Sequence, residues 1–195
     1  MCGRYFFGAE TERDVEMELG LKEGFFTMSA GDINPAMSPK VITAEKGGIS
    51  KDIRASEMFW GLTGKDKKLI INARSESVTT RSMFSDSFEH RRCIIPAAGF
   101  YEWDRDKNKV TFFKNDKRPI YLAGFYQLSD NRDSFVILTT AANESMIKVH
   151  DRMPLMIGGK DVRNWLYDNS AAKEMLSMQM PLLESSREYE QLSLF

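Results

Sequence analysis

The second residue of the chain is a cysteine, and this position gives it unusual chemistry. Initiator Met1 is usually excised before a small residue, so we expect Cys2 to carry a free α-amine beside its thiol. The ordinary pKa values of the two groups, about 7.7–8.0 and about 8.5, leave both partly reactive at neutral pH. The amine can attack an aldehyde to give an imine, and the thiol can then close a thiazolidine ring. Because this closure is intramolecular, its effective concentration is high.

Polar side chains also stand inside apolar, strand-like segments. Asn72 and Arg74 alternate in the segment 70–74 and should share one face of a strand. Glu102 lies between two large aromatic residues, and His150 precedes a proline-containing segment. Partial burial raises the pKa of a carboxyl, so Glu102 could move protons near neutrality. Structural roles stay open: a strand ion pair for Glu102, a helix cap for His150 and a sheet-edge donor for Asn72.

The elements that must position these residues are mostly short strands. Few helical segments separate them, which favours a mainly antiparallel sheet over a parallel one. The sequence therefore predicts a single α+β domain, a curled sheet with a β-barrel-like centre and a few flanking helices. We expect strands at 41–44, 58–62, 69–73, 93–97, 109–113, 120–126 and 135–140, a loop at 31–39, and helices at 10–21, 81–88, 144–150, 161–167 and 171–178.

Composition narrows the function classes. The 195 residues are 42% hydrophobic and 28% charged, which is typical of a globular protein and not of a disordered one. No apolar run is long enough to span a bilayer or to form a signal segment, so we expect a cytoplasmic protein that makes no membrane contact.

Cys2 and Cys93 are too few for a disulfide framework, and Cys93 should be a buried inert thiol. Two cysteines and two histidines at these spacings predict no metal site. The segment 64–118 is basic, as either a DNA-binding surface or a solvated face would be.

Several segments, in order, resemble the motifs of the SOS response-associated peptidase (SRAP) domain family. The resemblance runs from residue 1 to about residue 167. It implies the α+β fold above, no cofactor, and covalent trapping of abasic sites in single-stranded DNA by the processed cysteine, with lyase and autopeptidase activity. The motifs are Met1–Tyr5, Ile33–Pro35, Phe59–Leu62, Asn72–Glu76, Arg91–Trp103, Ile137–Thr140 and Val149–Leu155.

The resemblance also implies roles for single residues. Cys2 matches the nucleophile, Asn72 the residue that holds the amino terminus and sugar, Glu102 the proton-moving acid, and His150 the group that polarises the sugar hydroxyl. The positions that match phosphate contacts are Arg4, Arg74 and Arg152, and the candidates for base stacking are Trp60, Phe100 and Trp103. Core packing is the alternative for these aromatic residues.

The chain departs from longer members of the family at two places. The connection between Gly61 and Asn72 is short, and no terminal strand is recognisable after Tyr167. We therefore expect a domain at 1–180 and a tail at 181–195. The end of the tail resembles the peptide by which bacterial proteins dock on the DNA polymerase sliding clamp, through Gln191, Leu192, Leu194 and Phe195. A tail packed back onto the domain is the alternative.

Three functions follow from these patterns. The first is a monomeric, nucleoid-associated DNA damage response protein that traps abasic sites in single-stranded DNA through Cys2. The second is a thiol peptidase with Cys2 as nucleophile and Glu102 and His150 as a base system. The third is a non-catalytic adaptor that binds single strands and recruits the sliding clamp.

Overall fold

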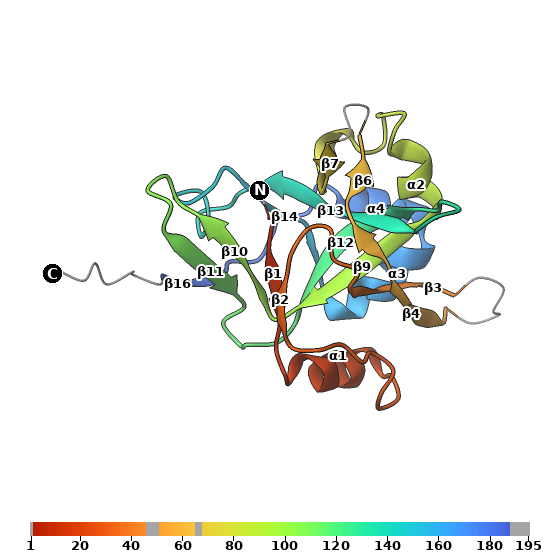
Figure 1. Ribbon diagram of the computed structural model, residues 1–195, viewed down its shortest axis with the longest axis horizontal. Coiled ribbons are helices and arrows are strands. Elements are labelled where there is room, and N and C mark those ends of the chain that lie inside the picture. The colour runs from red at the N-terminus through yellow and green to blue at the C-terminus, as the bar shows by residue number, and fades with distance from the viewer. Residues whose placement is uncertain (1, 46–50, 65–67, 188–195) are drawn as a thin grey trace, which may run out of the picture.

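Two curled β-sheets form the body of the molecule, seen in a computed structural model that describes residues 2–45, 51–64 and 68–187 (Figure 1). The smaller sheet is antiparallel throughout and has the strand order β16-β11-β10-β1-β2. Its strands are β1 (Tyr5–Phe7), β2 (Gly31–Ile33), β10 (Gly99–Trp103), β11 (Lys109–Phe113) and β16 (Glu184–Arg187).

The larger sheet follows the order β14-β13-β12-β9-β3-β4, with β15 paired to β12 and both β5 and β8 paired to β13. The β5 and β8 pairings are parallel and the others are antiparallel. The strands are β3 (Lys40–Ala44), β4 (Ile53–Glu57), β5 (Phe59–Trp60), β8 (Asn72–Arg74), β9 (Arg92–Ala97), β12 (Ile120–Gln127), β13 (Ser134–Ala141), β14 (Arg152–Pro154) and β15 (Met156–Ile157). A separate hairpin pairs β6 (Leu62–Thr63) with β7 (Leu69–Ile70).

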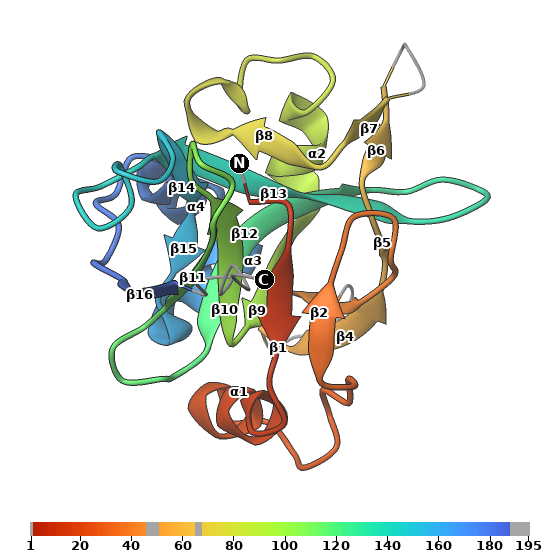
Figure 2. The ribbon, with the colours of Figure 1, turned by 60° about the vertical axis from the view of Figure 1, so that its left-hand side comes forward.

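The predicted fold class, α+β with curled and mainly antiparallel sheets, is confirmed. The pairings among the described strands do not close into a barrel. Figure 2 shows β1 and β10 side by side in front of the larger sheet, with β8 crossing above them. The buried faces of both sheets supply one continuous core.

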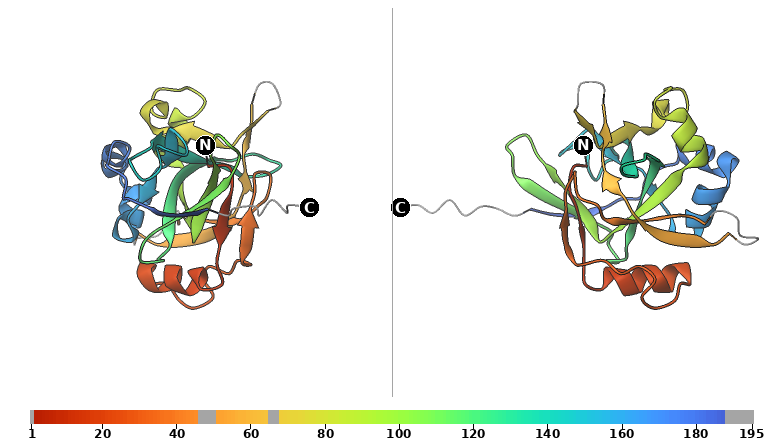
Figure 3. Two further views of the ribbon diagram at one scale, coloured as in Figure 1. Left: turned by 90° about the vertical axis from the view of Figure 1, so that its left-hand side faces the viewer. Right: turned by 45° about the vertical axis from the view of Figure 1, so that its right-hand side comes forward.

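Short helices cover the outside of the sheets. Helix α1 lies below them, as Figures 2 and 3 show, and the Arg163 side chain of α3 donates a hydrogen bond to the Leu19 carbonyl of α1 at 3.0 Å. Helix α1 buries Val15 and Leu19, spaced as the sequence predicts, and ends at Gly20, whose φ of 65° is left-handed. Trp165 donates a hydrogen bond to the Cys93 carbonyl at 3.0 Å and fixes α3 to β9. The helices are α1 (Thr11–Leu19), η1 (Ser75–Ser77), α2 (Ser85–His90), η2 (Gly159–Asp161), α3 (Val162–Tyr167) and α4 (Asn169–Met175).

Some local predictions are wrong. The expected strand 58–62 breaks at Gly61, whose φ of 131° and close approach to Leu69 leave no room for a Cβ atom. The expected helix 144–150 is a series of turns, and its Asn143 side chain binds the backbone N–H of Ser145. The loop expected at 31–39 begins with strand β2.

The chain does have a terminal strand. Strand β16 pairs with β11 from Phe113↔Glu184 to Val110↔Arg187 and completes the edge of the smaller sheet. The residues of β16 lie in the segment 181–195 that the sequence analysis expected to be a tail, and they belong to the sheet. The predicted clamp-binding residues Gln191, Leu192, Leu194 and Phe195 lie outside the described residues.

Candidate active site

Cys2 is held in place from both ends of its segment. The Asn72 amide nitrogen donates a hydrogen bond to the Cys2 carbonyl at 3.0 Å, across 70 residues of sequence. The Arg4 carbonyl accepts a hydrogen bond from the Tyr101 N–H at 2.9 Å, so the chain enters β1 already bound to β10. Cys2 itself is fully buried and its thiol is free. The hydrogen bond from Asn72 fixes the position of the Cys2 carbonyl.

Glu102 is brought to the same place by the alternation of β10. Phe100 and Glu102 point into the molecule, and Tyr101 and Trp103 point outward. Burial raises the pKa of Glu102, and the charge of His150 opposes this rise. Burial also raises the pKa of the Cys2 thiol well above its ordinary value, and the negative charge of Glu102 adds to the rise. These electrostatic interactions indicate that Glu102 lies near both Cys2 and His150.

His150 follows the turns after β13 and is partly exposed. Its Nδ1 accepts a hydrogen bond from the Arg152 N–H at 2.9 Å, and an Asp151 carboxylate oxygen lies 2.9 Å from the same nitrogen. The two contacts require different protonation of Nδ1. A backbone N–H can only donate, so Nδ1 must carry no proton to accept from Arg152, whereas a hydrogen bond to the Asp151 carboxylate requires a proton on Nδ1. We give precedence to the backbone contact, since Asp151 is 81% exposed. In the neutral ring the proton then resides on Nε2, where it can be donated.

Asn72 and Arg74 share one face of β8, as predicted, with Ala73 buried between them. Both line a hollow of about 590 Å³, which we call the arginine hollow. Its lining residues are Asn72, Ala73, Arg74, Ser77, Arg81 and Thr139. The sequence did not single out Arg81, although a second arginine beside the matched motif was a signal that could have found it.

The other two predicted arginines are already engaged. Arg152 makes a two-pronged contact with the Glu76 carboxylate at 2.6 and 2.9 Å and donates to the Thr139 carbonyl at 2.6 Å. Arg4 donates to the Asn34 side chain at 2.7 Å, and its guanidinium lies 5.2 Å from the ring centroid of Trp103. The structure therefore places Arg74 and Arg4 at accessible positions and ties Arg152 into an ion pair.

Of the three aromatic candidates for base stacking, two are fully buried and one is exposed. Trp60 is fully buried, donates to the Ile71 carbonyl at 3.0 Å and packs against Tyr5, so it serves the core and is not available for base stacking. Phe100 is also fully buried and stacks on Phe112. Trp103 is 37% exposed and presents its ring beside Arg4. The alternative of core packing thus applies to two of the three.

A family model named SOS response associated peptidase (SRAP) matches residues 1–193. The chain belongs to the SRAP family. Relatives include the abasic site processing protein YedK of Escherichia coli, 28% identical with 89% of this chain and 83% of YedK covered. The abasic site processing protein YoqW of Bacillus subtilis is 30% identical, with 99% and 92% covered. Among solved structures, a phage-related protein from Bordetella bronchiseptica, 22% identical, superposes with a TM-score of 0.77 over 96% of this chain and 94% of that one.

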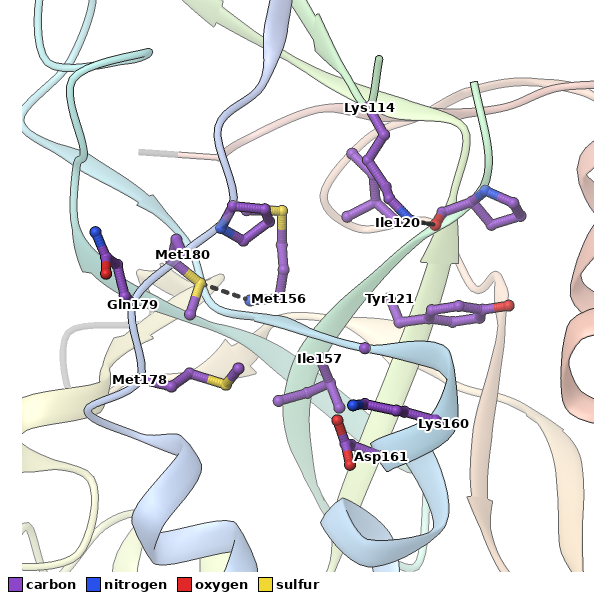
Figure 4. A pocket seen from close by; sticks show the side chains of 13 residues that line it. Lys114, Ile120, Tyr121, Met156, Ile157, Lys160, Asp161, Met178, Gln179 and Met180 are labelled. Atoms are coloured by element: carbon purple, nitrogen blue, oxygen red, sulfur yellow. Dashed lines mark hydrogen bonds between the residues drawn. The ribbon is translucent and has the colours of Figure 1, made fainter. Parts of the chain in front are cut away.

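This SRAP domain has a second hollow of about 560 Å³ with different walls (Figure 4). Figure 4 shows the side chains of Met156, Met178 and Met180 around it, and the Met156 N–H donates to the Met180 sulfur at 3.2 Å. We call it the methionine hollow. It shares no lining residue with the arginine hollow.

Cys93 is buried and free, as predicted for an inert thiol. No cluster of three or more His, Cys, Asp or Glu side chains suited to a metal ion occurs within residues 2–45, 51–64 and 68–187. No helix in the described part of the chain is both long and apolar enough to cross a membrane.

Proposed function

We propose that this SRAP-family protein processes abasic sites in DNA by trapping them covalently on Cys2, in single-stranded DNA and after removal of Met1. The observation that carries the proposal is that Cys2 receives a hydrogen bond from Asn72 and the influence of the Glu102 charge, while the charge of His150 acts on Glu102 in turn. The names of YedK and YoqW, abasic site processing proteins, support the substrate class.

The first step joins the Cys2 amine to the aldehyde carbon of the ring-opened sugar. The nitrogen attacks, a C–N bond forms, and water leaves as the imine appears. Glu102 moves protons in this step, and its raised pKa keeps a proton available closer to neutrality than an ordinary carboxyl would. The Asn72 carboxamide oxygen, which is buried and accepts no hydrogen bond from the described residues, suits the amine or a sugar hydroxyl as donor.

The second step adds the thiol across the imine and closes the thiazolidine. His150, with a proton on Nε2, donates to a sugar hydroxyl. Arg74 and Arg4 contact phosphates, and Trp103 stacks on a base, which in single-strand binders contributes about 1–3 kcal/mol per base. The raised pKa of the Cys2 thiol favours this order, with the amine acting first. It also argues against the thiol peptidase alternative, since a thiol nucleophile is usually activated by a lowered pKa.

Intact-protein mass spectrometry tests the proposal. The purified chain is first weighed to establish that Met1 is absent, and is then mixed with an oligonucleotide that contains one abasic site. We expect a one-to-one adduct that is stable without borohydride, and none with an undamaged oligonucleotide. Binding of DNA without an adduct would favour the adaptor alternative, and cleavage of an unrelated peptide would favour the peptidase.

The sliding clamp remains a separate prediction. Deletion of residues 191–195 should leave adduct formation intact and abolish co-purification with the clamp. Retained co-purification would contradict this prediction without bearing on the chemistry at Cys2.

A further inference from the structure

Glu76 is a carboxylate placed among the arginines of the candidate site. It lies in η1, two residues after Arg74. The Nη1 and Nη2 atoms of Arg152 donate to its two oxygens at 2.6 and 2.9 Å, so both prongs of the guanidinium are occupied. The Arg152 side chain is 14% exposed and that of Glu76 is 53% exposed. The carboxylate is therefore the more accessible partner of the pair.

The ion pair adjoins the arginine hollow. Arg152 also donates to the carbonyl of Thr139, a lining residue of that hollow, at 2.6 Å. Thr139 of β13 is the register partner of both Arg74 in β8 and Pro154 in β14, so β13 lies between these strands and the ion pair reaches across it. The hydrogen bond from Arg152 lowers the pKa of Glu76, and the charges of Arg152 and Arg74 add to this lowering. Glu76 is consequently ionised at neutral pH.

A carboxylate and a phosphate bind an arginine in the same way. Each accepts two parallel N–H bonds from the planar guanidinium. A DNA phosphate in the arginine hollow can therefore take both prongs of Arg152 only when Glu76 releases them. Glu76 also adds a negative charge beside the two exposed cations of the hollow, Arg74 and Arg81, and this charge repels a DNA strand. Repulsion of the wrong partner is one of the two ways to build specificity.

We propose that Glu76 is a specificity-determining residue, which withholds Arg152 from DNA phosphates and thereby limits the affinity of the protein for undamaged single strands. The inference rests on the proposed function, in which a covalent bond to Cys2 holds a damaged strand and non-covalent contacts alone hold an undamaged one. Weaker non-covalent binding shortens the time that the protein spends on undamaged DNA, while the covalent bond retains the damaged strand.

Glu76→Gln tests this role in the binding of an undamaged single-stranded oligonucleotide, measured by fluorescence anisotropy at several salt concentrations. The neutral amide cannot hold the guanidinium with two ionic hydrogen bonds, so Arg152 becomes available to a phosphate. We expect the affinity to rise by about 10-fold and the salt dependence to steepen by about 0.7, the value for one further phosphate contact on a single strand. Unchanged or weaker binding would overturn the inference and leave the ion pair as a structural link across β13.

Glu89→Gln is the matched control. Glu89 lies in α2, its side chain is 46% exposed, and its carboxylate is 3.7 Å from the Lys173 ammonium of α4. This variant removes the same charge and also frees a cation, but neither residue lines the arginine hollow. The affinity and the salt dependence should stay at their wild-type values. An equal gain in both variants would show an effect of net charge and overturn the inference.

Arg152→Met completes a double-mutant cycle with Glu76→Gln. In the Glu76→Gln background it should abolish the gain in affinity. In the wild-type background it should cost far less affinity, because Glu76 already occupies the guanidinium. A gain that persists without Arg152 would overturn the inference. If Arg152→Met does not fold, the salt dependence of Glu76→Gln against that of Glu89→Gln decides alone.

Competition between strands relates this binding to the chemistry at Cys2. An excess of undamaged strand should slow adduct formation with the damaged oligonucleotide more strongly in Glu76→Gln than in the wild-type protein. If the damaged oligonucleotide gives no adduct while the binding measurements follow the expected pattern, the proposed function fails and the effect of Glu76 on strand affinity stands. If the adduct forms and Glu76→Gln changes neither binding nor competition, the role of Glu76 fails alone.

Discussion

The arginine hollow and the methionine hollow are nearly equal in volume, about 590 and 560 Å³, and opposite in chemistry. The first opens beside Asn72, whose amide holds the backbone of Cys2, and carries the two exposed cations Arg74 and Arg81. The second is lined by Met156, Met178 and other largely apolar residues. Volume alone would not choose between them, so the position of the reactive residues has to decide.

The two hollows also differ in the buried polar atoms that lie near them. Among the described residues, side-chain atoms buried without a hydrogen-bond partner include the Asn72 oxygen and the hydroxyls of Tyr5 and Ser75, all on or beside the strands around Cys2. Such groups destabilise a folded protein unless something binds them. The Asn72 oxygen is the one among them whose side chain also binds the Cys2 backbone, so a substrate bound beside Cys2 would supply the partner that this oxygen lacks.

Cys2→Ala should have the largest effect on the side of the arginine hollow. It removes the sulfur, and without it the ring cannot close, so the borohydride-independent adduct should be lost completely in intact-mass measurements. Cys93→Ala is the matched control because Cys93 is equally buried and free. It should keep the adduct, and a stable adduct in Cys2→Ala would refute the aminothiol mechanism.

Glu102→Gln should slow imine formation by about 10²- to 10⁴-fold, the range for loss of a general acid–base group. The single-turnover rate of borohydride-trapped product measures this effect. A change of less than a few-fold would remove Glu102 from the proton-transfer role and leave it the strand ion pair that the sequence also allowed.

Glu102→Gln should also change how the stability of the folded chain depends on pH. Burial raises the pKa of Glu102, so the folded chain retains a proton that the unfolded chain releases near pH of about 4.3, and stability falls as the pH rises through the folded pKa. Glu102→Gln should lack this fall in stability when thermal unfolding is measured from about pH 4 to about pH 8. The hydrogen bond from Arg152 lowers the pKa of Glu76, so the wild-type chain loses the stability that this carboxylate contributes as the pH falls. Glu76→Gln should lack this loss at acidic pH.

Arg74→Ala should weaken binding of any single strand by about 10-fold and reduce the slope of affinity against salt by about one counterion, because a phosphate contact is lost. Lys160→Ala is the control on the methionine hollow, where an exposed cation of equal charge lines the wall. If both substitutions change the slope equally, the effect is that of net charge and the comparison between the hollows breaks down.

Alternation and motif order made much of this site predictable. The alternation of β8 correctly placed Asn72 and Arg74 on one face, and the matched motifs indicated Cys2, Glu102 and His150, which come together in space. Local patterns could not reveal that Glu76 engages Arg152, because the pair spans 76 residues of sequence.

Which residues of the matched motifs are buried was harder to predict than which of them lie near the site. Trp60 and Trp103 are both aromatic residues in matched motifs, but only the first lies on a strand packed between Tyr5 and Phe135. Strand β16 was missed because its residues are exposed and polar, and its pairing depends on a partner strand far away in the sequence. Such tertiary context overrides local propensity.

Met178→Leu should have the smallest effect. Met178 lines the methionine hollow and is 37% exposed, and leucine preserves its volume and apolar character, so the free energy of unfolding should change by no more than about 0.5 kcal/mol. Neither imine formation nor ring closure should change, because this wall shares no residue with the arginine hollow. A slower reaction without loss of stability would mean that the two hollows are coupled through the sheet. In that case the apolar hollow could no longer be treated as a region apart from the chemistry, and the contrast drawn from their walls would fail.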